Sequence, residues 1–227
     1  FGTSALFISL IVFTLVTLVM MPFLPHYPID DVVKNQAQAD DASASKGPLL
    51  LTLFAIFLFQ AANMGLFAYM IGLGKAEGLE MSFMSTSLGW ASWIALLGCF
   101  LVITVGTKYG RTIPLMIAIL MTALCSWILH YSESANTYLI TNVIIGITWA
   151  FVLPYLFGIC SELDKTGQLA AAGGFASKMG LATGPMVGAL LLGGDDYGIV
   201  IDVSVIALVA CAFVAFKPAK LLDRSPA

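Results

Sequence analysis

Residues 49–74 read "LLLTLFAIFLFQAANMGLFAYMIGLG" and contain no charged side chain. The hydrocarbon core of a bilayer is roughly 30 Å thick, and about 20 helical residues, each rising about 1.5 Å, cross it. This stretch is long enough, and the whole chain is 59% hydrophobic and 10% charged with a mean hydropathy of +0.96. The sequence therefore predicts an all-α, polytopic membrane protein. Six further apolar stretches of comparable length are residues 1–24, 83–106, 112–130, 136–160, 168–192 and 197–216.

The basic residues between these stretches are distributed unevenly. If the stretches cross the membrane in turn, one side has a single basic residue, Lys75, whereas the other has eight. Cytoplasmic loops carry an excess of Lys and Arg, so we expect a multi-pass protein of the cell (inner) membrane with a cytoplasmic C-terminus. The net charge of −3 indicates less about the topology than this distribution of basic residues does. The eight residues on the cytoplasmic side are Lys34, Lys46, Lys108, Arg111, Lys165, Lys217, Lys220 and Arg224.

The chain divides into four predicted parts. Residues 1–25 form one transmembrane helix, and the polar residues 26–48 form a cytoplasmic linker that has too few apolar side chains to build a core. Residues 49–218 form a six-helix bundle with short loops, and residues 219–227 a cytoplasmic tail. Because the first span has no preceding basic residue and begins with Phe, we expect a piece of a longer chain rather than a signal peptide.

Small residues recur on one face of the sixth predicted span, residues 168–192. This spacing lets another helix backbone approach closely. Pro185 in this span and Pro154 in the preceding one indicate places where a helix can bend. Tight packing and movement during a conformational cycle are both compatible with the pattern. The small residues are Ala176, Gly180, Gly184 and Gly188.

The turn at residues 106–115, "GTKYGRTIPL", resembles the loop signature G-x-x-x-D-R-x-G-R-R of the Major Facilitator Superfamily. Lys108 matches its first basic position, and Gly110 and Arg111 match its G-R pair; Gly106 begins the same loop. Thr107 stands where the family prefers Asp, and Thr112 where a second Arg is common. Residues 161–188, "SELDKTGQLAAAGGFASKMGLATGPMVG", resemble the connection between helices ten and eleven of many bacterial members.

The resemblance covers essentially the whole chain and implies helix six, the central linker and helices seven to twelve of a twelve-helix carrier. It implies a secondary transporter rather than an enzyme, which moves a small-molecule substrate by alternating access near the bilayer midplane. Membrane lipid and the missing N-terminal six-helix half are the other implied partners. We expect no cofactor: the four cysteines lie in four different spans without a CxxC pair, which favours packing over a metal or disulfide site.

Polar residues inside the predicted spans are the candidates for lining a substrate cavity. Lys178 lies roughly 15 Å from the start of its span, where a charge is costly unless it faces a polar cavity or a partner. It would hold an anionic group or pair with a carboxylate; alternatively, its side chain reaches the cytoplasmic surface. Two pairs share a helix face: Gln60 with Asn63, and Asn142 with Trp149. Each pair would contact a polar solute or join neighbouring helices.

Other function classes fit less well. An intramembrane metalloprotease needs an H-E-x-x-H motif, whereas His26 and His130 lie outside the spans or at their ends. A seven-helix retinal receptor needs a lysine deep in the seventh span, and residues 199–216 contain none. Glu162 and Asp202 lie near span ends, so no carboxylate at mid-membrane depth is available to carry protons. Nucleic-acid binding has no basic patch to support it.

Overall fold

The computed structural model describes residues 3–23, 46–163, 168–193 and 196–224. Two compact units are distinguished, Phe1–Ala42 and Ser43–Ala227. In the first unit, α1 (Thr3–Met20) is followed by the short 3-10 helix η1 (Met21–Phe23). The predicted linker, residues 26–48, lies almost wholly outside the described residues. Across the described ranges the chain forms helices and no strand, which confirms the predicted all-α fold class.

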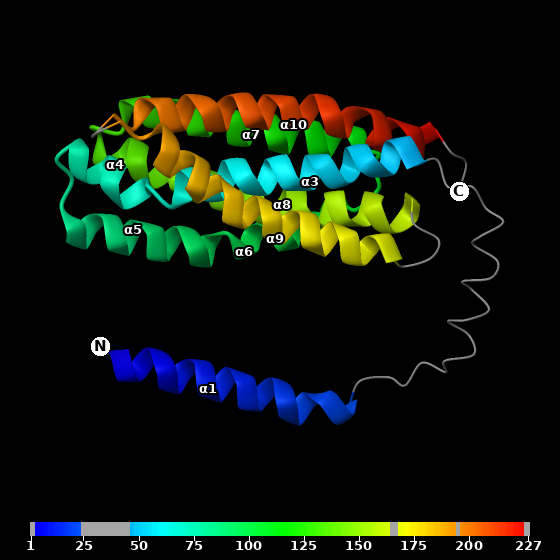
Figure 1. The fold of residues 1–227 in the computed structure, drawn as a ribbon, viewed down its shortest axis with the longest axis horizontal. Coiled ribbons are helices and arrows are strands. Elements are labelled where there is room, and N and C mark those ends of the chain that lie inside the picture. The colour runs from blue at the N-terminus through cyan, green and yellow to red at the C-terminus, as the bar shows by residue number, and fades with distance from the viewer. Residues whose placement is uncertain (1–2, 24–45, 164–167, 194–195, 225–227) are drawn as a thin grey trace. The chain divides into compact units, whose positions relative to one another are not determined.

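The second unit is a helical bundle whose elements follow the predicted spans closely (Figure 1). The predicted span 49–74 is two helices, interrupted at Ala68 and Tyr69, and the span 83–106 is two helices that meet at Ala95. The last helix continues through Pro218 into the predicted tail. The helices are α3 (Lys46–Phe67), α4 (Met70–Ala76), α5 (Met81–Ile94), α6 (Leu96–Val105), α7 (Thr112–Ile128), the 3-10 helix η2 (Leu129–Tyr131), α8 (Ala135–Leu163), α9 (Gln168–Leu191) and α10 (Gly198–Arg224).

Five helical segments in the described part of the chain are long and apolar enough to cross a membrane, where the sequence predicted seven. In addition, a shorter apolar helical segment, Leu10–Phe23, covers the second half of α1 and η1. The 24-residue helix α9 is long enough, but its glycines and Lys178 lower its hydropathy, which explains why it is not among the five. The five segments are Gly47–Phe67, Met81–Val105, Thr112–Tyr131, Ala135–Leu163 and Gly198–Arg224.

The helices of the second unit lie side by side, with α9 packed along α3 more extensively than any other pair (Figure 1). Helix α10 packs on α3 and α7, and α8 packs on α5, α6 and α7. One buried cluster includes Phe59, Ile119 and Leu156, and a second includes Met84 and Tyr138. Helix α3 is therefore flanked by α9 on one side and by α8 and α10 on others, and it contributes to both the core and the candidate site.

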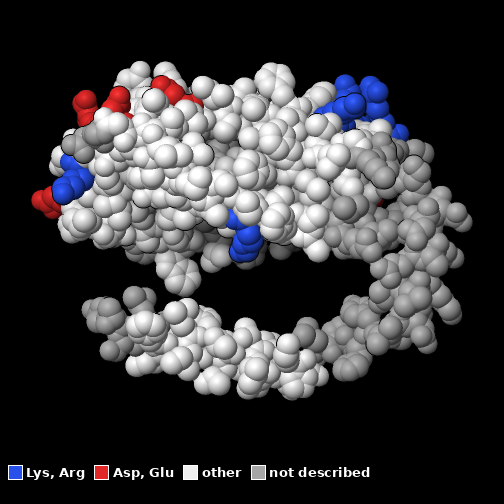
Figure 2. Space-filling model, viewed as in Figure 1, with Lys and Arg blue, Asp and Glu red and all other residues white. Residues whose placement is uncertain are grey.

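Charged side chains lie mainly at the two ends of the bundle. On the face shown in Figure 2, basic side chains gather at one end and acidic side chains mostly at the other. At one end, the loop that contains Arg111 contacts Asp223 at the end of α10. At the other end, Glu77, His130 and Asp196 line one hollow. The alternation of loops between two ends agrees with the zigzag path that the sequence predicted.

Candidate functional site

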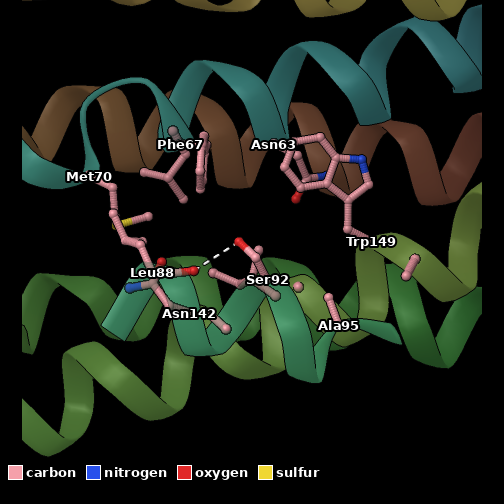
Figure 3. A pocket seen from close by; sticks show the side chains of 13 residues that line it. Asn63, Phe67, Met70, Leu88, Ser92, Ala95, Asn142 and Trp149 are labelled. Carbon is pink, nitrogen blue, oxygen red and sulfur yellow. Dashed lines mark hydrogen bonds between the residues drawn. The ribbon is translucent and has the colours of Figure 1, made fainter. Parts of the chain in front are cut away.

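A cavity of about 330 Å³ lies between α3, α4, α5 and α8 (Figure 3). It is located at mid-length of the bundle: Trp149 on its wall is the fifteenth residue of the 29-residue helix α8. Most of its wall is apolar, and no charged side chain is among the residues that line it. Those residues are Asn63, Leu66, Phe67, Met70, Leu88, Ala91, Ser92, Ala95, Asn142, Ile145, Gly146, Trp149 and Ala150.

Asn63 contributes a buried amide from α3. Its side chain is 3% exposed, and Nδ2 donates a hydrogen bond to the backbone oxygen of Phe59 at 2.8 Å. A carbonyl can only accept, so the amide nitrogen must face Phe59 and the amide oxygen must point away from it. That oxygen, Oδ1, has no hydrogen-bond partner among the described residues. Figure 3 shows it on the cavity side of the helix.

Asn142 on α8 makes the same kind of bond to its own helix. Its Nδ2 donates one N–H to the backbone oxygen of Tyr138 at 2.8 Å and keeps a second N–H beside the amide oxygen. Ser92 on α5 donates its hydroxyl proton to the backbone oxygen of Leu88 at 2.8 Å (Figure 3). The hydroxyl oxygen of Ser92 can still accept. Three helices thus each present a polar atom to a cavity that is otherwise apolar.

Trp149 lines the cavity with its ring and makes its hydrogen bond elsewhere. Its indole Nε1 donates to Oε1 of Gln60 at 2.8 Å, and Nε2 of Gln60 donates to the hydroxyl of Ser177 at 2.7 Å. Gln60 and Ser177 are 4% and 6% exposed. This chain of hydrogen bonds joins α8, α3 and α9 beside the cavity. The ring of Trp149 also meets Phe67 edge to face, with centroids 6.3 Å apart.

Lys178 is exposed and does not line this cavity. It is the eleventh residue of α9, which begins at Gln168, so its side chain starts near the middle of the helix. Among the described residues it has no hydrogen bond or ion pair. Its neighbour Ser177 faces inward to Gln60. The side of α9 that carries Lys178 therefore faces away from α3.

Of the five predicted cavity residues, the structure brings three together: Asn63, Asn142 and Trp149. Gln60 lies behind Trp149, and Lys178 lies apart. Whether any of the five binds substrate stays a prediction. Sequence reasoning missed Ser92 and Ser177, because a serine inside a helix commonly bonds its own backbone, and the sequence does not show which serine faces a neighbouring helix.

The loop motif forms a polar cluster at the basic end of the bundle. Arg111 makes two short hydrogen bonds from Nη2 to the Glu162 carboxylate, at 2.7 and 2.6 Å, and one from Nε at 3.2 Å. Asp223 at the end of α10 accepts from the backbone nitrogens of Arg111 and Thr112 at 2.6 and 2.9 Å. It also accepts from the Thr112 hydroxyl at 2.6 Å. Asp223 thus caps the start of α7 from a distant part of the chain.

The two glycines of the motif have backbone conformations that favour glycine. Gly106 and Gly110 have φ of +48° and +72°, and Gly106 accepts a hydrogen bond from the Tyr155 hydroxyl at 2.5 Å. A Cβ on Gly110 would lie 2.9 Å from the Asp223 carboxylate. Lys108 is exposed. The motif therefore holds the loop against α8 and α10 without the acidic residue that Thr107 replaces.

The fold and the cavity define a polytopic helical membrane protein with a largely apolar cavity inside its bundle, to which three helices supply polar atoms. The sequence profile of the Major Facilitator Superfamily matches residues 1–189 of the 227. The chain belongs to the Major Facilitator Superfamily, a family of membrane transporters rather than enzymes. This confirms the resemblance carried by the loop at Gly106–Arg111. The comparison with curated proteins finds no match.

Proposed function

We propose that this chain moves a small polar organic solute by alternating access, and that the cavity between α3, α5 and α8 forms part of the solute's path. The observation that carries the proposal is the cavity itself. It lies at mid-length of the bundle, where carriers with two half-bundles place their substrates, and three helices each supply a polar atom to it. Its volume lies near the lower end of the range for small-molecule sites.

The proposal includes a second six-helix bundle as the partner that completes the cavity. Lys178 supports this part. A charge at the centre of a membrane helix costs about 2.5–3.5 kcal/mol on insertion scales, so its exposed face should meet protein or water rather than lipid. We therefore assign that face of α9 to the partner bundle or to the solute path. In a carrier containing both halves, Lys178→Ala should weaken substrate binding or turnover; unchanged kinetics would assign Lys178 to packing alone.

The last part of the proposal is the orientation of the chain in the membrane. The chain lies in an inner membrane, and the end of the bundle that carries Lys108, Arg111 and Arg224 faces the cytoplasm. The eight-to-one distribution of basic residues supports it. A tag in the turn at Gly78 should be accessible only from outside the cell, and access only from the cytosol would contradict the orientation.

Transport is the direct test. In liposomes we expect saturable, substrate-selective flux from a carrier that contains this chain together with a first six-helix bundle. We expect none from the printed chain alone, because half of the cavity wall is then absent. Selective flux by the chain alone would contradict the two-bundle proposal. A single cysteine at Ser92, labelled from each side in turn, would test alternating access: labelling from one side only, in every state, would contradict it.

A further inference from the structure

Each polar side chain on the cavity wall already donates one hydrogen bond within the protein. The amide nitrogens of Asn63 and Asn142 donate to the backbone oxygens of Phe59 and Tyr138. The Ser92 hydroxyl donates to Leu88, and the Trp149 indole donates to Gln60. Each amide nitrogen keeps a second N–H, so a ligand in this cavity meets amide and hydroxyl oxygens together with the remaining amide N–H groups.

The Asn63 oxygen is the strongest single indication of a ligand. It is buried, it has no partner among the described residues, and it lies on the cavity wall. A buried acceptor without a donor is energetically costly, so such an atom in a cavity indicates a donor that arrives with a ligand or water. Only a molecule that supplies an N–H or O–H group can satisfy this oxygen.

We propose that the cavity binds a small organic ammonium: a protonated amine on an aromatic or apolar body. This inference rests on the proposed transport function and narrows its substrate class. The ammonium group would donate to the oxygens of Asn63 and Asn142. The aromatic rings of Trp149 and Phe67 would contact the body of the ligand or attract its charge, as cations are attracted to ring faces.

An anionic substrate fits this cavity poorly. No Lys, Arg or His is among the residues that line it, and oxygen acceptors repel a carboxylate. Lys178, which would favour an anion, lies on the exposed side of α9. The volume of about 330 Å³ suits a compound with one ring better than a large one. The unpaired Asn63 oxygen, the aromatic rings and the size therefore point to the same kind of ligand.

Binding of matched probes to a detergent-purified carrier that contains this chain together with a first six-helix bundle, measured by calorimetry, tests the inference. The probes are 2-phenylethylamine, 2-phenylethanol and 3-phenylpropionate, which share a ring and differ in the polar group. We expect the amine to bind at least about tenfold more tightly than the carboxylate, with the alcohol between them, since a hydrogen bond from a charged donor is stronger than one from a neutral donor. Equal or tighter binding of 3-phenylpropionate, or binding of none of the three, would overturn the inference.

Substitutions of single asparagine residues test whether Asn63 binds the ammonium group. Asn63→Leu should weaken amine binding by about tenfold or more, because it removes the unpaired acceptor. Asn63→Asp should tighten it, because it adds a negative charge beside the ammonium. Asn136→Leu is the matched control, since Asn136 is exposed in the first turn of α8, and it should leave binding unchanged. Circular dichroism of each variant verifies that the helices persist. An Asn63→Leu variant that is folded and binds the amine normally would contradict the assignment.

The outcomes separate this inference from the proposed transport function. If a two-bundle carrier transports some solute and phenylethylamine neither binds nor competes, the ammonium inference fails and the transport proposal stands. If phenylethylamine binds at Asn63 as expected but the two-bundle carrier shows no flux of any tested solute, the transport proposal fails and the binding site stands.

Discussion

The two sides of α3 differ in how closely the neighbouring helices approach. On the α9 side, a Cβ added to Gly65 would lie 3.2 Å from the backbone oxygen of Gly184. A Cβ on Gly184 would in turn meet the backbone of Ala61 and Gly65. On the side toward α5 and α8, the cavity of about 330 Å³ separates the helices. One side of α3 is closely packed, and the other leaves room for a ligand.

This difference gives two neighbouring polar residues different surroundings. Gln60 and Asn63 lie one turn apart on α3, and both are buried. Gln60 bonds Trp149 and Ser177 and so joins three helices. Asn63 bonds only its own helix through Nδ2 and leaves an oxygen toward the cavity. Buried polar residues in a membrane helix can thus stabilise a helix interface or serve a ligand, and hydrogen-bond partners distinguish the two roles.

The largest expected effect is that of Gly184→Ala on the closely packed side. The new methyl group would overlap backbone atoms of Ala61 and Gly65, which cannot rotate away as a side chain would. Overpacking of this kind costs typically 1–3 kcal/mol, and backbone obstacles place this change at about 3. Unfolding by dodecyl sulfate in mixed micelles, followed by circular dichroism, measures the loss. Gly174→Ala is the control on the same helix, since a Cβ there has nothing within 4 Å.

Equal stability of the Gly184 and Gly174 variants would show that α9 does not pack on α3 as described. In that case the contrast between the two sides of α3 would fail, because the closely packed side would tolerate added volume as the cavity does.

Gln60→Leu should have the next largest effect. The change leaves the Trp149 indole N–H and the Ser177 hydroxyl without their partner in a buried place. An unsatisfied buried donor costs about 1–3 kcal/mol, and the Ser177 oxygen also loses the hydrogen bond that it accepts, so we expect a total of about 2 kcal/mol. The same unfolding assay measures it. A variant as stable as the wild type would mean that Gln60 does not join these helices.

The sequence allowed the helices and the close approach of α9 to be predicted with good accuracy. Apolar runs interrupted by short polar turns predict spanning helices, since only a helix satisfies its own backbone in lipid. Residues 112–130 and 168–192 correspond to helices α7 and α9 within a few residues. The four-residue spacing of Gly180, Gly184 and Gly188 predicted a close contact, and all three meet α3 or Tyr69, which follows it.

The roles of the polar residues could not be predicted in the same way. Helical spacing places Gln60 and Asn63 on one face, but a turn between them is enough to direct one toward α9 and the other toward the cavity. The capping of α7 by Asp223 joins residues more than a hundred positions apart, and no local pattern signals it. Glu162, recognised only as a residue near a span end, binds Arg111. Such contacts depend on how the helices pack together.

Trp149 lies between the cavity and the hydrogen bonds that join α3 to α9. The substitution Trp149→Phe should lower the free energy of unfolding by less than Gln60→Leu does. The phenyl ring keeps most of the wall area, but the oxygen of Gln60 loses its donor. Because Trp149 is only partly buried beside the cavity, water can replace part of the lost bond, and we expect about 1 kcal/mol. In the double variant Gln60→Leu, Trp149→Phe, the two losses should be less than additive, since both remove one bond. Full additivity in the unfolding assay would contradict the bond.

Asn63→Leu should have the smallest effect on stability and separates the two roles most directly. The substitution removes a buried oxygen that has no partner in the described chain, and the Phe59 carbonyl that loses the Asn63 amide is already within a helix. We therefore expect the free energy of unfolding to stay within about 0.5 kcal/mol of the wild type, whereas the same change at Gln60 lowers it. A loss at Asn63 as large as that at Gln60 would mean that Asn63 also holds the bundle together. Unchanged stability together with loss of amine binding would instead indicate that Asn63 contacts the ligand, since its unpaired oxygen contributes nothing to helix packing.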